Sequence, residues 1–139
     1  MAIPTLSNFS PFNYSGTGFK TINADSGTGK ITIDLSVAEN NFILNARNGN
    51  NNYLFFTGIS SDEYGKSGTC FLVNAGSSTE WLSTYLYNGS TNPTYTPAAA
   101  VPGTPPSGAG KVSMVTYFIN NSGHIYVNVV NDWQAHPAP

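Results

Sequence analysis

The sequence predicts an all-β protein, a single-domain antiparallel β-sandwich of the jelly-roll type with about eight strands. Short segments rich in β-branched and aromatic residues alternate with clusters of Gly, Asn and Ser, which is typical of strands separated by turns. No segment longer than two helical turns has a period of 3.6 residues. The length of 139 residues suits one domain, and the 40% hydrophobic and 13% aromatic content indicates a folded chain.

The clearest strand lies at residues 30–37, where Ile31, Ile33, Leu35 and Val37 alternate with polar residues. This period of two indicates a strand with one buried face. The same reasoning predicts further strands at residues 19–24, 41–47, 53–59, 68–75, 79–87, 111–119 and 124–130. The segments between them have turn composition, and the Pro- and Gly-rich run at 97–110 predicts a long loop before a terminal hairpin.

The predicted strand at 111–119 is apolar on both faces. Strand alternation places Val112, Met114 and Phe118 on one side and Val115, Tyr117 and Ile119 on the other. Such a strand is either central and covered on both faces, or packed against another subunit. A two-layer sandwich covers only one face of each sheet, so this pattern favours oligomerisation. We therefore expect Met114, Tyr117 and Phe118 to contribute to an interface with another subunit or a partner protein.

The two ends of the chain are expected to extend from the sandwich, which we place at residues 17–133. Residues 1–16 contain Phe9, Phe12 and Tyr14 without a clear period and predict an extended arm, and residues 134–139 predict a tail. The aromatic residues of the arm need a partner surface. That surface is either the sandwich of the same chain or a neighbouring subunit, in which case all three residues belong to the interface.

Composition excludes several classes of partner. Charged residues make up 9% of the chain, the net charge is −2, and the five basic residues are scattered, so no nucleic-acid surface is expected. No apolar run approaches about 20 residues, and no basic amphipathic helix is present, so no membrane partner is expected. The first residues lack the charged and apolar stretches of a signal peptide.

The sequence predicts neither an enzyme nor a metal or cofactor site. The only histidines, His124 and His136, have no partners at ligand spacing, and the acidic residues are dispersed. No catalytic motif is found, so we expect no catalytic residues. Cys70 is the only cysteine, which excludes an internal disulfide, and its strand context predicts a buried, inert thiol.

Aromatic residues near Asn-rich loops suggest a binding surface. Alternation in segment 79–87 places Trp81, Tyr85 and Tyr87 on one side of the strand, and Tyr95 follows soon after. Such amphipathic rings suit stacking on sugars, so the four residues are candidates for glycan binding. In the alternative interpretation Trp81 belongs to the core and the tyrosines to a subunit interface.

Five segments in a fixed order carry a resemblance to a known family. They are Gly65-Lys-Ser-Gly-Thr-Cys-Phe-Leu-Val-Asn74, Thr79-Glu-Trp-Leu82, the Pro/Gly run, Ala109-Gly-Lys-Val-Ser-Met-Val-Thr-Tyr-Phe118 and Asn131-Asp-Trp133. Over about residues 30–133 the chain resembles a β-rich module of tailed-phage virion proteins, namely tail fibres, head fibres and capsid decoration proteins. Ser113 stands where the module usually carries Asp, and Trp133 where it usually carries Phe.

The resemblance implies a structural protein of the phage virion. It favours a homotrimeric capsid decoration (cement) protein that binds and stabilises the capsid lattice, with itself and the major capsid protein or other virion proteins as partners. The implied location is the virion, at the capsid surface rather than the tail, after synthesis in the host cytoplasm. The alternative is a receptor-binding tail or head fibre module that recognises host cell-surface glycan.

Overall fold

The computed structural model describes residues 19–49, 51–76, 80–89, 94–96, 105–106, 108–131 and 133. Within these residues the only helix is the short 3-10 helix η1 (Ser61–Glu63), and the rest of the regular structure is strand, which confirms the all-β prediction. All eight expected strands form; they are β1 (Lys20–Asn23), β2 (Lys30–Asp34), β3 (Phe42–Asn45), β4 (Asn52–Thr57), β5 (Ser67–Val73), β6 (Trp81–Asn88), β8 (Val112–Ile119) and β9 (Ile125–Val130). The remaining strand, β7 (Thr94–Tyr95), is too short to leave a pattern in the sequence. The predicted arm at 1–16, with Phe9, Phe12 and Tyr14, and the tail at 134–139 lie outside the described residues.

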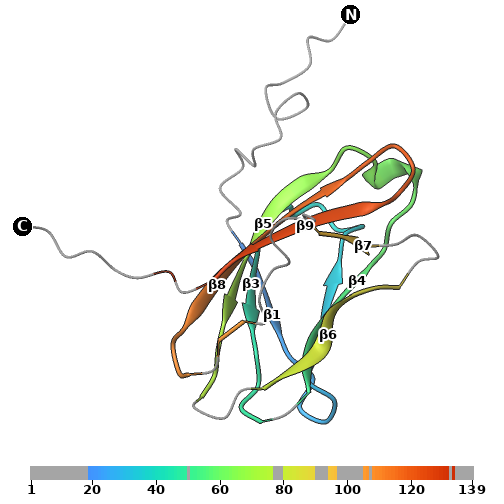
Figure 1. The fold of residues 1–139 in the computed structure, drawn as a ribbon. Coiled ribbons are helices and arrows are strands. Elements are labelled where there is room, and N and C mark those ends of the chain that lie inside the picture. The colour runs from blue at the N-terminus through green and yellow to red at the C-terminus, as the bar shows by residue number, and fades with distance from the viewer. Residues whose placement is uncertain are drawn as a thin grey trace, which may run out of the picture.

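The strands form two sheets around one hydrophobic core (Figure 1). The larger sheet has six strands in the order β1-β3-β5-β8-β9-β7, and the smaller sheet has three in the order β2-β4-β6. Both sheets contribute fully buried side chains to a single cluster, among them Ile31, Ile33, Leu54 and Phe56 from the smaller sheet and Phe42, Leu44, Cys70 and Val115 from the larger one. These eight inward side chains are those that strand alternation predicts, because one face of each sheet packs on this core.

From β1 to β6 the chain passes to the opposite sheet after every strand. Each strand therefore lies parallel to the strand two positions earlier, so that Lys20 lies beside Phe42, Phe42 beside Cys70, and Lys30 beside Tyr53. We call this part of the chain the two-sheet winding, and its coils are β1–β2, β3–β4 and β5–β6. Each coil repeats the path of the one before it and adds one strand to each sheet.

The C-terminal part of the chain has a different arrangement. Strands β8 and β9 form an antiparallel hairpin, β8 lies antiparallel to β5, and β7 lies parallel to β9. Five of the seven strand pairs are parallel, so the expectation of an antiparallel sandwich is wrong for the winding. Alternation in a sequence shows which side chains are buried but carries no information on the direction of the neighbouring strand. Parallel neighbours need a long crossover, and here a strand of the opposite sheet supplies it.

A buried asparagine connects successive coils. Asn52, at the start of β4, is fully buried, and its side-chain Oδ1 accepts a hydrogen bond of 3.0 Å from the backbone N–H of Arg47. Its Nδ2 donates to the carbonyl oxygens of Arg47 at 3.1 Å, Gly49 at 3.0 Å and Glu80 at 3.0 Å. The amide thereby joins the connection after β3 to the segment before β6. Because unpaired polar groups are costly inside a protein, these four bonds specify the path of both connections.

Replacement of Asn52 by alanine should destabilise the protein strongly. The Asn52→Ala substitution removes the four hydrogen bonds of a fully buried amide, so we expect the free energy of unfolding to fall by about 2–4 kcal/mol. Equilibrium unfolding in urea measures this loss. The matched control is Asn128→Ala, which removes an exposed amide on β9 and should change the stability by less than about 0.5 kcal/mol. Equal stabilities of the two variants would contradict the role of Asn52.

Candidate functional site on the outer face of the six-stranded sheet

The outer face of the six-stranded sheet is almost free of charge. The six strands contain one charged residue, Lys20. A sheet face in contact with water normally carries polar and charged side chains. Here the outward positions hold uncharged polar and apolar residues, which makes this face the strongest candidate for a binding surface in the described part of the chain.

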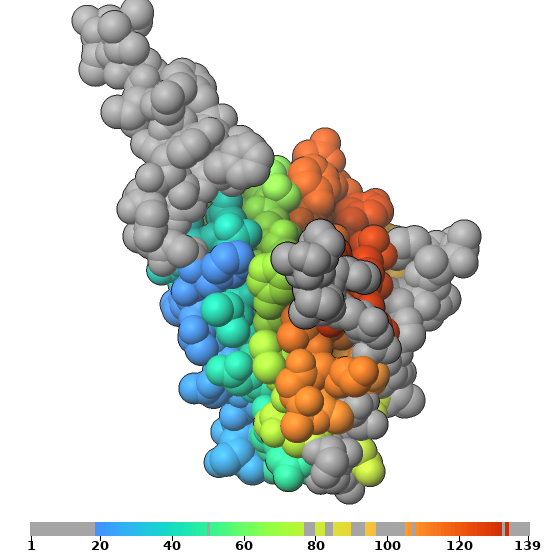
Figure 2. All heavy atoms as spheres, turned by 90° about the vertical axis from the view of Figure 1, so that its left-hand side faces the viewer, coloured from blue at the N-terminus to red at the C-terminus, as the bar shows by residue number. Residues whose placement is uncertain are grey.

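A row of apolar side chains crosses the middle of this face. The register places Ile43, Phe71, Met114 and Val130 beside one another on β3, β5, β8 and β9. The first three are half-buried and Val130 is 43% exposed, while the ring of Phe19 packs on Phe71 with a centroid distance of 5.5 Å. We call Ile43, Phe71, Met114 and Val130 the apolar row. Figure 2 views the molecule from this side, with the strands from β1 in blue to β9 in red next to one another.

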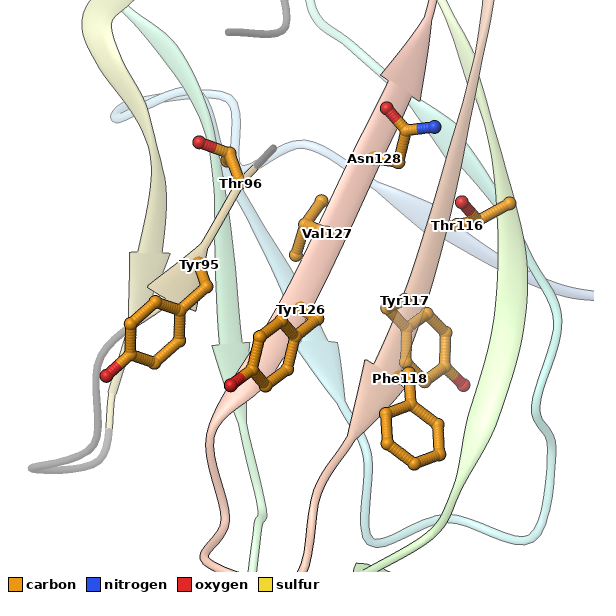
Figure 3. Close-up of a pocket in the computed structure, with 8 residues that line it drawn as sticks. All are labelled: Tyr95, Thr96, Thr116, Tyr117, Phe118, Tyr126, Val127 and Asn128. Atoms are coloured by element: carbon orange, nitrogen blue, oxygen red, sulfur yellow. The ribbon is translucent and has the colours of Figure 1, made fainter. Parts of the chain in front are cut away.

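An aromatic groove lies on the same face, near β7. Tyr95, Tyr126 and Phe118 follow one another across β7, β9 and β8, and the rings of Tyr95 and Tyr126 are stacked at 5.0 Å with an angle of 16° between their planes. The groove has a volume of about 570 Å³ and includes the polar side chains of Thr116 and Asn128, which are register partners (Figure 3). Phe118 is 47% exposed and Tyr126 is 45% exposed, so ring surfaces are available to a ligand. We call this site the aromatic groove.

Strand β8 presents its two faces to different surroundings. Met114 and Phe118 point outward, where alternation predicts them, and they lie in the apolar row and the aromatic groove respectively. Tyr117 is only 3% exposed, and its hydroxyl donates a 2.7 Å hydrogen bond to the carbonyl oxygen of Asn40. Its expected place in a subunit interface is therefore wrong, because the smaller sheet of the same chain covers this side of β8.

The glycan candidates on β6 do not lie on one face. Tyr85 is 5% exposed and belongs to the core, whereas Tyr87 is 37% exposed, so the expected shared face is wrong. Trp81 is half-buried, and its ring lies 5.9 Å from that of Tyr85. The pairing of β6 with β4 is irregular between the pair Asn52–Trp81 and the pair Leu54–Leu86. Such a bulge adds residues to one strand and breaks the alternation on which the expectation depended.

The remaining candidates are separated between the two sheets. Tyr87 packs edge-on against Tyr53 at 5.2 Å, on the outer face of the three-stranded sheet. Tyr95 is the only sequence-predicted glycan candidate in the aromatic groove, where Tyr126 joins it. Alternation in β9 is enough to place Tyr126 outward. Its contact with Tyr95 depends on the parallel pairing of β7 with β9, which no sequence pattern signals.

The described residues contain no cluster of three or more His, Cys, Asp or Glu side chains that could hold a metal ion. Cys70 is fully buried, as predicted, and burial raises the pKa of its thiol. His124 packs against the ring of Tyr95 at 5.3 Å, and His136 lies outside the described residues. No helix in the part of the chain that the structure describes is long and apolar enough to cross a membrane.

Comparisons of this chain with protein families, with curated proteins and with solved structures find no match. The function is therefore inferred from the residues of the outer face. That face combines an apolar row with an aromatic groove and has almost no charge. Both features suit the binding of an uncharged surface or ligand.

Alkaline pH should destabilise the protein partly through Tyr85. Burial raises the pKa of Tyr85 to about 12, so folding favours the protonated phenol. In the unfolded chain a tyrosine ionises near pH 10. The contribution of Tyr85 is thus complete below about pH 10 and is lost as the pH rises to about 12. Between about pH 10 and pH 12, the free energy of unfolding of Tyr85→Phe should fall by about 1–3 kcal/mol less than that of the parent protein. Urea unfolding at each pH measures this difference. Identical pH dependence in both proteins would contradict this assignment.

Proposed function

We propose that this chain is a homo-oligomeric structural protein of a phage virion, in the form of a trimeric decoration protein that binds and stabilises the capsid lattice. The apolar row on the uncharged face of the six-stranded sheet carries the proposal. The resemblance of residues 30–133 to the β-rich module of phage virion proteins supports the virion location. The proposed activity is binding, with no catalytic step and no cofactor.

The chemistry of the outer face favours a second copy of the chain as partner. Contiguous apolar side chains on a soluble protein mark interaction surfaces, and the apolar row runs across four neighbouring strands. Because the strands of this face carry almost no charge, copies can approach one another without electrostatic repulsion. Uncharged polar residues such as Thr69 and Thr116, which are register partners on β5 and β8, can donate and accept hydrogen bonds beside the apolar row.

The fold is compatible with the sandwich modules from which many virion proteins are built. Two sheets enclose one core, and the hairpin of β8 and β9 widens the larger sheet beyond the winding. We propose that the winding with its terminal hairpin is a two-sheet β-sandwich module in which most neighbouring strands are parallel. In this arrangement the widened sheet serves assembly, and the major capsid protein is the second partner.

The apolar row is tested by introducing a charge at its centre. Met114→Lys places an ammonium group in the proposed interface, where burial of an unpaired charge is strongly unfavourable. Size-exclusion chromatography with light scattering should give the mass of a trimer of the 14.8 kDa chain for the parent protein and of a monomer for the variant. Thr57→Lys, on the outer face of the three-stranded sheet, is the matched control and should stay trimeric. A monomeric parent, or a folded Met114→Lys trimer, would refute the interface.

A second candidate function is recognition of a host cell-surface glycan by a tail or head fibre. The aromatic groove favours it, because the stacked rings of Tyr95 and Tyr126 lie beside the polar groups of Thr116 and Asn128. A sugar ring presents apolar C–H groups on its faces and hydroxyl groups at its edge, which matches this combination. The groove residues carry no Asp, Glu, Lys or Arg, so a neutral glycan is the ligand class that fits.

Glycan binding is tested with an array of neutral oligosaccharides. If the groove binds sugar, Tyr126→Ala should weaken binding at least about tenfold, since it removes one ring of the stacked pair. Tyr87→Ala, on the other sheet, should leave binding unchanged. Absence of any saturable binding would remove this candidate, and immunogold labelling of virion heads rather than tails would favour the decoration protein.

A further inference from the structure

The outer face of the six-stranded sheet carries an aromatic surface at each side. At one side Phe19, which directly precedes β1, packs its ring on Phe71 of β5 at 5.5 Å, and Ile43 of β3 lies beside Phe71. We call Phe19, Ile43 and Phe71 the Phe19 patch. At the other side the stacked rings of Tyr95 and Tyr126 line the aromatic groove (Figure 3). The patch and the groove therefore lie on different strands of the same face.

The Phe19 patch and the aromatic groove are too far apart to form one small binding site. Tyr126 lies two strands away from Phe71, and in the register of β5, β8 and β9 it is four residues further along. From the usual spacing of strands and residues, the two positions are about 16 Å apart. A single side chain of a partner therefore contacts one of these surfaces and not both.

The apolar row alone is too small for a stable contact between two copies. Its four side chains cover about 19 Å across the strands and about 7 Å along them, or roughly 130 Å² of the sheet. A specific interface buries about 800 Å² of each partner. A contact that includes the apolar row must therefore extend over much of the outer face, where the Phe19 patch and the aromatic groove lie.

No charged group of the described residues obstructs such a contact. Neither the Phe19 patch nor the lining of the groove contains Asp, Glu, Lys or Arg. Lys20, the charged residue in the strands of this sheet, is the register partner of the buried Phe42. Register partners point to the same face, so Lys20 lies on the inward side of β1, where it lines a hollow together with Asp34. Association through the outer face then buries no unpaired charge.

A trimer needs two different contact surfaces on each copy. In a closed ring of three, every junction is heterologous, so one surface of a copy meets a different surface of the next. In a two-fold dimer a surface meets its own counterpart. The outer face fits the ring, because it offers the 41% exposed ring of Phe19 at one side and a hollow lined by exposed rings at the other.

We infer that in the proposed trimer the aromatic groove of each copy receives the Phe19 patch of the next copy. This pairing rests on the proposed trimeric function and specifies which surfaces meet at its junctions. Aromatic rings prefer offset or edge-to-face contacts, which Phe19 can make with the stack of Tyr95 and Tyr126. Because the pairing covers the groove, assembly into the trimer and glycan binding are alternative uses of the same surface.

An exchange of charges tests the pairing. Phe19→Glu and Tyr126→Lys each place a charge in the contact and should raise the concentration of half-maximal trimer formation at least about 100-fold. With both substitutions in one chain, opposite charges meet at every junction, so at least about tenfold of this loss should be recovered. The matched control combines Phe19→Lys with Tyr126→Lys; like charges then meet, and no recovery is expected. Sedimentation equilibrium over a concentration series measures these changes.

Two outcomes would overturn the pairing and leave the trimer itself standing. One is a Tyr126→Lys variant that remains as trimeric as the parent protein. The other is an opposite-charge double variant that associates more weakly than both single variants, as expected if each surface met its own counterpart. A monomeric parent protein would overturn the proposed trimer and the pairing together.

A measurement on the parent protein does not depend on the folding of any variant. Equal amounts of ¹³C-labelled and unlabelled chain are unfolded and refolded together, and isotope-filtered NMR then detects contacts between copies. We expect nuclear Overhauser effects between the ring of Phe19 in one copy and the rings of Tyr95 or Tyr126 in another. A trimer without these contacts would overturn the pairing.

Discussion

The structure depends on hydrogen-bond partners for the backbone N–H and C=O groups wherever the chain passes from one sheet to the other. In the two-sheet winding this passage follows every strand, so each connection runs along the margin of the core. Asn52 binds two connections with its buried amide. Arg47 donates to the carbonyl of Ser26 at 2.5 Å, and Lys66 donates from Nζ to the carbonyls of Leu35 at 2.7 Å and Val37 at 2.5 Å. Polar and charged side chains thus supply hydrogen bonds to the backbone of the connections.

The strands of the larger sheet, by contrast, contain a single charged residue, Lys20. Burial lowers the pKa of Lys66, and the nearby negative charge of Glu63 opposes that shift. The ammonium group of Lys66 donates its hydrogen bonds to backbone carbonyl oxygens. On the three-stranded sheet, the Nζ of Lys30 lies 3.8 Å from the ring centroid of Phe55 and partly covers it. Among the described residues, the ring of Phe19 packs on Phe71 of the six-stranded sheet, and no cation–π contact is found on that face. The two sheets therefore differ in surface chemistry as well as in size, and the proposed binding surface lies on the larger one.

Alternation in the sequence predicts side-chain positions correctly where the local pattern controls the structure. It fails where pairing with a distant strand controls the structure. The inward positions of Ile31, Ile33 and Cys70 follow from period-two patterns, as does the outward position of Met114. Tyr85 was misplaced because the bulge in β6 is fixed by its pairing with β4. Tyr117 lies in the core because the smaller sheet covers that side of β8. The alternation in β8 cannot show where that sheet lies.

By itself the sequence determined the all-β class, the positions of eight strands and the buried state of Cys70, because each depends on short-range periodicity and side-chain type. Only the tertiary structure decided the direction of the strands. Parallel coils arise when a strand of the opposite sheet serves as the crossover, and that relation joins residues more than twenty positions apart. The same long-range pairing placed Tyr95 on Tyr126, since a two-residue strand gains its position from its partner and not from its own sequence.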